Sequence, residues 1–201
     1  MLHRLQARRK LSLRLIVAGL IPLVALVQSS WPAQSWVQAV VQALGLWLIV
    51  ACICGRAWCA LYIGGRKSVE LVELGPYSIS RNPLYLFSFL GAIGVGLRTG
   101  SLVMTALFMI ASIVVAIPVI RVEEMVMTRT FGSSFAAYCA RVPRFGPRLS
   151  LWCDAPMLSL QPRHLYRVFR DSLLFASAIP LIDAVTWLQG HATLPVLVRL
   201  P

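Results

Sequence analysis

Long stretches without any charged residue constrain the fold of this chain more than any other feature. No Asp, Glu, Lys or Arg occurs in residues 15–55, 82–97 or 99–120. A helix needs about 20 apolar residues to cross a lipid bilayer, so the first block is long enough for two spanning helices and each of the others for one. Only 13% of the residues are charged, against about 25% in a typical soluble domain. The sequence therefore predicts an all-α polytopic membrane protein.

The basic residues are concentrated in three segments. The formal net charge is +12, and every Lys and Arg except Arg98 and Arg199 lies in residues 1–14, 56–81 or 121–170. Membrane-flanking loops rich in Lys and Arg face the cytoplasm, so the pattern predicts a cytoplasmic N-terminus and a C-terminus on the outer side. Attraction to anionic lipid head groups explains the basic character. We therefore expect the bilayer, and not nucleic acid, as the partner of these segments.

About five spanning helices in a single integral membrane domain follow from this pattern. Residues 1–68 form a basic arm and a helical hairpin, residues 69–148 carry the polar motifs, and residues 149–201 hold a basic linker and a C-terminal span. The fourth helix is expected to continue to Gly132, because glycine is favoured just past a helix end. Asp183, in the last span, is expected to be hydrated at the outer interface. The predicted spans cover residues 13–28, 36–57, 85–97, 101–120 and 172–188.

The five cysteines give no indication of a metal site. Cys52, Cys54, Cys59, Cys139 and Cys153 lack the paired spacing of metal ligands. We interpret them as small apolar side chains in a reducing environment.

One polar turn interrupts the apolar spans at residues 75–85. Gly75-Pro76 ends regular structure, and Pro83 is well placed in the first turn of the following helix. Asn82 then occupies the N-cap, beside backbone N–H groups that have no partner within the helix. Such a helix start suits a polar or anionic part of a ligand. The alternative is an ordinary loop that re-enters the bilayer.

Polar clusters flank the predicted hairpin of the third and fourth spans. In an antiparallel hairpin they lie at the same membrane depth, and together they offer aromatic faces, an amide, helix-end N–H groups and carboxylates. These groups suit a cationic ligand with amino, carboxylate and adenine parts. Alternatively, the carboxylates form surface ion pairs with Arg121, Arg129 or Arg141. The clusters are Tyr77, Arg81, Asn82 and Tyr85 before the hairpin, and Arg121, Glu123 and Glu124 after it.

The sequence contains Gly75-Pro76-Tyr77, Arg81-Asn82-Pro83-Leu84-Tyr85, Glu123-Glu124, Phe131-Gly132, Tyr138 and Val142-Pro143-Arg144-Phe145. In order and spacing, over about residues 69–147, these motifs resemble the isoprenylcysteine carboxyl methyltransferase family. That family belongs to a wider group that includes phospholipid N-methyltransferases. The family's usual Arg-His-Pro is replaced here by Arg81-Asn82-Pro83.

The resemblance implies a membrane-embedded enzyme with a cofactor pocket for S-adenosylmethionine on the cytoplasmic side. Its acceptor would be lipophilic, either an isoprenylcysteine-like substrate methylated on its carboxylate or a lipid head group. The family's substrate-facing arginine corresponds to Val119, and Arg121 is the nearest substitute. The cofactor contacts carried over from the family are Leu71, Val72, Tyr77, Asn82, Pro83, Leu84, Tyr85 and Glu123.

Glu123 and Glu124 cannot both face one point, because adjacent helical residues point about 100° apart. The resemblance gives the inward position to Glu123 and leaves Glu124 to pair with surface arginines such as Arg121 or Arg129. Two other functions remain open from the sequence: a membrane NADPH enzyme similar to sterol reductases, and a non-catalytic membrane scaffold.

Overall fold

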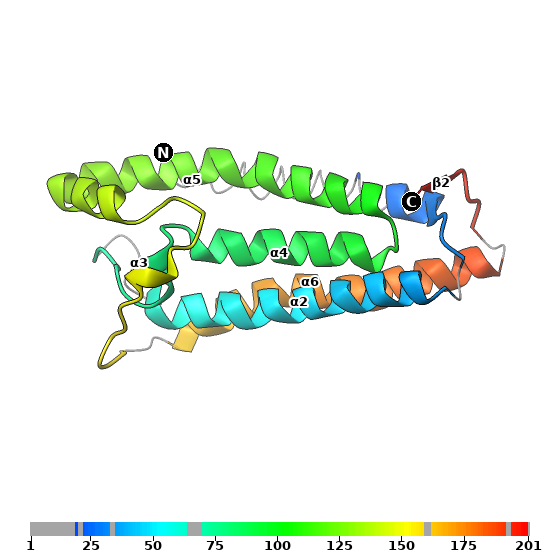
Figure 1. The fold of residues 1–201 in the computed structure, drawn as a ribbon, viewed down its shortest axis with the longest axis horizontal. Coiled ribbons are helices and arrows are strands. Elements are labelled where there is room, and N and C mark those ends of the chain that lie inside the picture. The colour runs from blue at the N-terminus through cyan, green and yellow to red at the C-terminus, as the bar shows by residue number, and fades with distance from the viewer. Residues whose placement is uncertain are drawn as a thin grey trace. The chain divides into compact units, whose positions relative to one another are not determined.

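The apolar blocks form long helices. The structure, a computed structural model, describes residues 19, 22–32, 35–63, 70–158, 162–191 and 194–200. Its elements, labelled in Figure 1 where there is room, are β1 (Val27–Ser29), α2 (Trp36–Ile63), α3 (Pro76–Ile79), α4 (Pro83–Arg98), α5 (Leu102–Arg141), the short 3-10 helix η1 (Leu149–Leu151), α6 (Pro162–Gly190) and β2 (Val198–Leu200).

The prediction of an all-α polytopic membrane protein is confirmed. Within the described ranges, α2, α5 and α6 are long and apolar enough to cross a membrane, and α4 is a shorter apolar helix. These four helices correspond to the last four predicted spans. The first predicted span, residues 13–28, lies largely outside the described residues.

The last helix is longer than predicted. It is α6, which begins at Pro162 and not at residue 172, because proline suits a first helical turn and the basic residues that follow continue the helix. The fourth helix continues beyond residue 120, as expected, and is interrupted at Gly132, which has φ 51° and ψ −119°. The predicted break at Gly132 is therefore confirmed, and a further helical segment follows it to Arg141.

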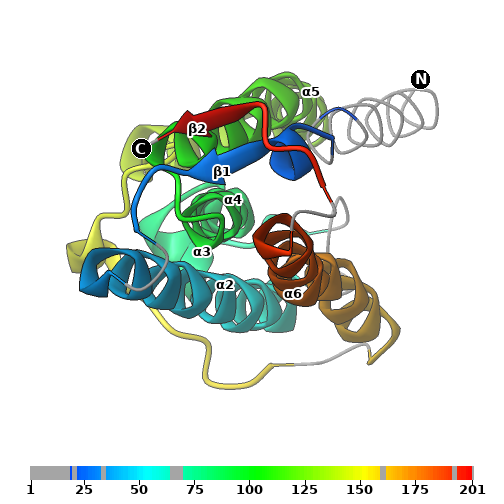
Figure 2. The same ribbon diagram turned by 90° about the vertical axis from the view of Figure 1, so that its right-hand side faces the viewer.

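The first predicted span ends earlier than expected. Residues 22–26 are helical, but residues 27–29 form β1, which pairs in parallel with β2 (Figure 2). The Leu197 N–H donates to the Leu26 carbonyl, and the Ser30 N–H donates to the Leu200 carbonyl. Hydrogen bonds to the C-terminal segment thus replace the helical ones.

The chain divides into two compact units that alternate along the sequence. Unit 1 comprises Met1–Ala51, Phe89–Val119 and Leu174–Pro201, and unit 2 comprises Cys52–Ser88 and Ile120–Leu173. All of the predicted cofactor residues, and all of the motif residues from 75 to 85, belong to unit 2.

Glycine contacts bring helix backbones together in unit 1. A Cβ on Gly45 of α2 would lie 2.7 Å from the Gly94 carbonyl oxygen, and a Cβ on Gly94 would lie 2.7 Å from that of Gly45. Glycine at both positions therefore allows this close packing of α2 and α4. In the same unit, Arg98 pairs with Asp183 at 2.6 Å. The expectation that Asp183 is simply hydrated was wrong, because the end of α4 brings an arginine to it.

Candidate cofactor and substrate site

The polar turn of unit 2 is built on a glycine that no other residue replaces easily. Gly75 has φ 60°, and a Cβ there would lie 2.2 Å from the Tyr62 ring. Its N–H donates to the Cys153 carbonyl at 2.7 Å. Ser78 Oγ donates to the Gly75 carbonyl at 2.6 Å and accepts from the Cys153 N–H at 3.1 Å. These bonds fasten α3 to the segment around residue 153.

The segment after α5 holds the other side of this turn. The Arg81 N–H donates to the Pro143 carbonyl at 2.9 Å, and the Arg148 N–H donates to the Ile79 carbonyl at 3.0 Å. Tyr138 adds a hydroxyl bond to the Tyr77 carbonyl at 2.8 Å. Two motifs separated by about sixty residues therefore lie side by side.

The predicted N-cap position of Asn82 is confirmed, but its side chain has a different use. Its carbonyl accepts the N–H groups of Tyr85 and Leu86 at the start of α4. Its amide Nδ2 instead lies 3.4 Å from Glu124 Oε1 and 3.4 Å from the Arg144 carbonyl oxygen. The Asn82 amide thus links α4 to α5 and to the segment after it.

Glu123 and Glu124 both meet this turn, each through a different residue. The Tyr85 hydroxyl lies 3.3 Å from Glu123 Oε2. Glu124 accepts from both Arg144 Nε, at 3.1 Å, and Arg144 Nη2, and it pairs with Arg81 Nη1 at 3.4 Å. Its hydrogen bond raises the pKa of the Arg144 guanidinium. The expectation that Glu124 pairs with Arg121 or Arg129 was wrong.

The position of Arg144 explains that error. Glycine at residue 132 breaks α5, and the chain then returns so that residues 142–148 lie beside the turn. A residue 20 positions after Glu124 therefore becomes its partner, which no local helical spacing indicates. The motif Val142-Pro143-Arg144-Phe145 was the only signal for Arg144 in the sequence. Arg121, the predicted substrate-facing residue, has an exposed side chain.

Tyr77 lies at the centre of the buried part of the site. It packs with Cys59 and Tyr62, and Val72 and Leu84 flank the same cluster. Its side chain is only 6% exposed, and in the described part of the chain its hydroxyl has no hydrogen-bond partner. Burial, with smaller contributions from neighbouring ionisable groups that include Glu123, raises the pKa of Tyr77 well above its ordinary value. The hydroxyl is therefore a neutral, buried donor whose bonding capacity is unused.

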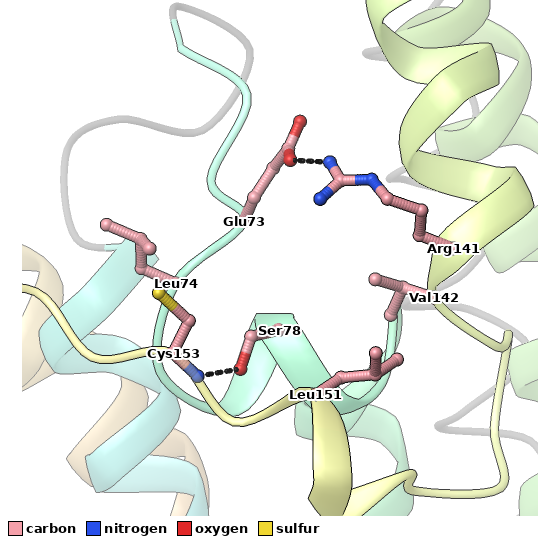
Figure 3. Close-up of a pocket in the computed structure, with 7 residues that line it drawn as sticks. All are labelled: Glu73, Leu74, Ser78, Arg141, Val142, Leu151 and Cys153. Atoms are coloured by element: carbon pink, nitrogen blue, oxygen red, sulfur yellow. Dashed lines mark hydrogen bonds and ion pairs between the residues drawn. The ribbon is translucent and has the colours of Figure 1, made fainter.

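Two neighbouring cavities open beside the turn. The first, of about 150 Å³, is crossed by the ion pair of Glu73 and Arg141 (Figure 3). The second, of about 270 Å³, is lined in part by Leu71 and Val72, two of the predicted cofactor contacts. Glu73 and Leu74 line both cavities.

The other predicted contacts gather elsewhere in unit 2. Tyr77, Asn82, Tyr85 and Glu123 do not line either of these two cavities. Val72 joins the two places, because it lines the larger cavity and packs against the cluster that contains Tyr77. Among the residues that the structure describes, no group of three His, Cys, Asp or Glu side chains could hold a metal ion.

The sequence profile of the phospholipid methyltransferase family matches residues 33–134. This chain belongs to the phospholipid methyltransferase family. The match contains the turn at residues 75–85 and both glutamates, and it confirms the resemblance to the wider methyltransferase group. It ends before Tyr138 and the segment at residues 142–148.

Two relatives that this chain resembles are named as metal resistance proteins. The chain is 35% identical over 196 residues to the nickel-cobalt-cadmium resistance protein NccN of Alcaligenes xylosoxydans xylosoxydans, covering 96% of this chain and 91% of that protein. It is 33% identical over 187 residues to the cobalt-zinc-cadmium resistance protein CzcN of Cupriavidus metallidurans, covering 93% of this chain and 86% of that protein. No solved structure matches the chain significantly.

Proposed function

We propose that this chain is an integral membrane methyltransferase that uses S-adenosylmethionine and acts on a lipophilic acceptor. The observation that carries the proposal is the contact of Tyr85 with Glu123 in unit 2, which also contains the unpartnered hydroxyl of Tyr77, inside the region that matches the family. A buried donor without a partner is costly to the apoprotein, so its retention is consistent with a ligand that accepts from it.

The residues present fit the chemistry of this cofactor. S-Adenosylmethionine supplies a methyl group on a positively charged sulfonium. The aromatic faces of Tyr77 and Tyr85 would hold a cation, each worth about 0.5–2 kcal/mol, and the Glu123 carboxylate would bind the cofactor's amino group or ribose hydroxyls. Leu71 and Val72 provide an apolar wall at the larger cavity. The remaining predicted contacts are Asn82, Pro83 and Leu84 at the start of α4.

The protein's part in the reaction would be positioning more than acid–base chemistry. Attack of a carboxylate or another ready nucleophile on the sulfonium methyl group is an in-line displacement, so orientation and exclusion of water supply most of the rate gain. The acceptor would be an isoprenylcysteine-like carboxylate or a lipid head group that enters from the inner leaflet. Arg121 is the proposed substrate-facing residue. The charge pattern of the sequence places it on the cytoplasmic side.

The names of the relatives suggest where such a reaction is used. Cobalt and cadmium occur in the names of both NccN and CzcN. We propose that this chain contributes to resistance against these metals by methylating a membrane component. A deletion strain should gain sensitivity to cobalt or cadmium, and wild-type protein should restore resistance, whereas Tyr85→Ala should not.

Calorimetric titration of the detergent-solubilised protein with S-adenosylmethionine and with NADPH tests the proposal. Wild-type protein should bind S-adenosylmethionine. Tyr85→Ala should weaken binding tenfold to over a hundredfold, because a bond to a charged ligand group is worth about 1.5–3 kcal/mol. Asn82→Ala should also weaken binding, because it removes the amide that ties the start of α4 to Glu124 and to the Arg144 carbonyl. Tyr166→Ala is the matched control, because Tyr166 is an exposed tyrosine on α6.

Each other outcome has a distinct meaning. Binding of NADPH without S-adenosylmethionine would favour the reductase, and binding of neither would favour the scaffold. Unchanged affinity in both Tyr85→Ala and Asn82→Ala would refute the assigned site.

A further inference from the structure

An arginine in α2 is held between two other helices of unit 2. Arg56 Nε donates to Ser172 Oγ of α6 at 2.9 Å, and Arg56 Nη1 donates to Ser88 Oγ of α4. Arginine near the end of a membrane-spanning helix reaches the interface, where its charge meets lipid head groups. No part of the methyltransferase site described above uses Arg56.

The two serines are oriented to receive this arginine. Ser88 Oγ donates its own hydrogen to the Leu84 carbonyl at 2.8 Å, and Ser172 Oγ donates to the Val168 carbonyl at 2.8 Å. Each hydroxyl oxygen can therefore accept from Arg56. Because a serine hydroxyl is neutral, these two contacts fix the direction of the guanidinium without cancelling its charge.

A close approach of α2 and α4 brings the arginine into position. A Cβ on Gly55 would lie 2.2 Å from the Phe87 ring, so only glycine allows this packing. Arg56 follows Gly55 directly, and Ser88 follows Phe87 directly. The contact between Gly55 and Phe87 therefore places the Arg56 guanidinium against the first half of α4.

The position along α2 corresponds to the depth of a lipid head group. Arg56 follows Trp36 by 20 residues, which is about 30 Å of helix and matches the hydrocarbon thickness of a bilayer. Tryptophan favours the membrane interface. With Trp36 at one interface, Arg56 lies near the phosphates of the opposite leaflet.

The same position is close to the proposed reaction site. Ser88 lies three residues after Tyr85 on α4, about one helical turn away, and the Tyr85 hydroxyl contacts Glu123. An amphiphile held by its anionic group at Arg56 would have its head group beside Tyr85 and its chains in the hydrocarbon.

We propose that Arg56, oriented by Ser88 and Ser172, is a binding subsite for the oxyanion of an amphiphile, a phosphate or a carboxylate. A guanidinium suits both, because its planar N–H groups match their oxygens. That the amphiphile is the methyl acceptor rests on the proposed function. The binding of its oxyanion does not.

The test uses the full chain in dodecyl maltoside micelles, with dodecyl phosphate as the probe. Calorimetry measures the dissociation constant, expressed as the mole fraction of dodecyl phosphate in the micelles. Wild-type protein should bind dodecyl phosphate and should not bind inorganic phosphate. Arg56→Gln should weaken binding at least tenfold, and Arg56→Lys should weaken it less. Arg98→Gln is the matched control, because Arg98 pairs with Asp183 in unit 1; its affinity should stay within twofold.

S-Adenosylmethionine affinity, measured on the same samples, separates this proposal from the proposed function. It should stay within twofold in Arg56→Gln. Failure of wild-type protein to bind S-adenosylmethionine while it binds dodecyl phosphate through Arg56 would refute the methyltransferase and leave the subsite standing.

Several results would overturn the subsite. These are no binding of dodecyl phosphate to wild-type protein, equal affinity in Arg56→Gln, an equal loss in Arg98→Gln, or Arg56-dependent binding of inorganic phosphate. If Arg56→Gln does not fold, the double variant Ser88→Ala/Ser172→Ala keeps the charge and loses its orientation. It should bind at least threefold more weakly, and unchanged affinity there would refute the role of the serines.

Discussion

Replacing Glu124 by glutamine should destabilise the protein, whereas the same replacement of Glu123 should leave its stability almost unchanged. The Glu124 carboxylate accepts two hydrogen bonds from Arg144 and pairs with Arg81. Glu123 has the longer contact with the Tyr85 hydroxyl, 3.3 Å, and a glutamine oxygen there can still accept. The two adjacent acids therefore differ in how much of the fold depends on their charge.

Solvent exposure sets the size of the effect. The side chains of Glu124 and Arg81 are 14% and 16% exposed, and that of Arg144 is 43% exposed. A sheltered hydrogen bond to a charged group contributes about 1.5–3 kcal/mol, and an exposed pair about 0–1 kcal/mol. Because glutamine keeps one acceptor oxygen, we expect Glu124→Gln to lower the free energy of unfolding by about 2–3 kcal/mol. The corresponding loss for Glu123→Gln should be below about 1 kcal/mol.

Thermal unfolding in detergent, followed by circular dichroism, measures the difference. For a chain of this size, 1 kcal/mol shifts Tm by about 2–4 °C, so Glu124→Gln should melt about 4–12 °C below wild type. Arg129→Gln is the matched control on the same helix, and its Tm should not change. S-Adenosylmethionine affinity should show the opposite order, with the larger loss in Glu123→Gln. A Tm for Glu124→Gln within 1 °C of wild type, or a larger drop in Glu123→Gln, would refute the assignment of Glu124 to the stability of the fold and of Glu123 to the cofactor.

Three further predictions follow from the turn and from the charge pattern. Gly75→Ala should lower the free energy of unfolding by about 2–5 kcal/mol, because the added Cβ overpacks against Tyr62 and the backbone there is left-handed. Gly146→Ala is the control, because a Cβ at that position meets nothing within 4 Å. Tyr77→Phe should leave the stability of the apoprotein unchanged or raise it by about 1 kcal/mol while weakening S-adenosylmethionine binding; a clear loss of stability would show that the hydroxyl has a structural partner. Membrane-impermeant thiol labelling should reach native Cys153 and an introduced cysteine, Arg199→Cys, from opposite sides of the membrane, and labelling of both from one side would contradict the predicted topology.

Features set by local composition could be predicted from the sequence. The charge-free blocks predicted α2, α4 and α5, since a membrane span depends only on the apolar character of a continuous segment. Pro83 at the start of α4 and the break at Gly132 were likewise predicted, because proline and glycine restrict their own backbone. The phospholipid methyltransferase match confirms the family group that the spaced motifs indicated.

Contacts between distant segments could not be predicted in this way. The partners of Glu124, the pair of Arg98 with Asp183, and the strand β1 all depend on where the chain returns after a turn. Hydropathy and helical period carry no information about that return path. The expectation of a helix up to residue 28 failed for this reason, since its last residues bond to a segment about 170 residues later.

The family match and the hydrogen bonds of the turn together separate two parts of the site. The matched region, residues 33–134, contains every predicted cofactor contact. Three further bonds to the turn come from outside the matched region: the Tyr138 hydroxyl donates to the Tyr77 carbonyl, the Pro143 carbonyl accepts the Arg81 N–H, and the Cys153 carbonyl accepts the Gly75 N–H. A chain that ended at the matched region would keep the proposed ligand-binding side chains and lose these three bonds to the turn. Because methyl transfer depends on orientation, the segment after Gly132 is as necessary to the proposed activity as the turn itself.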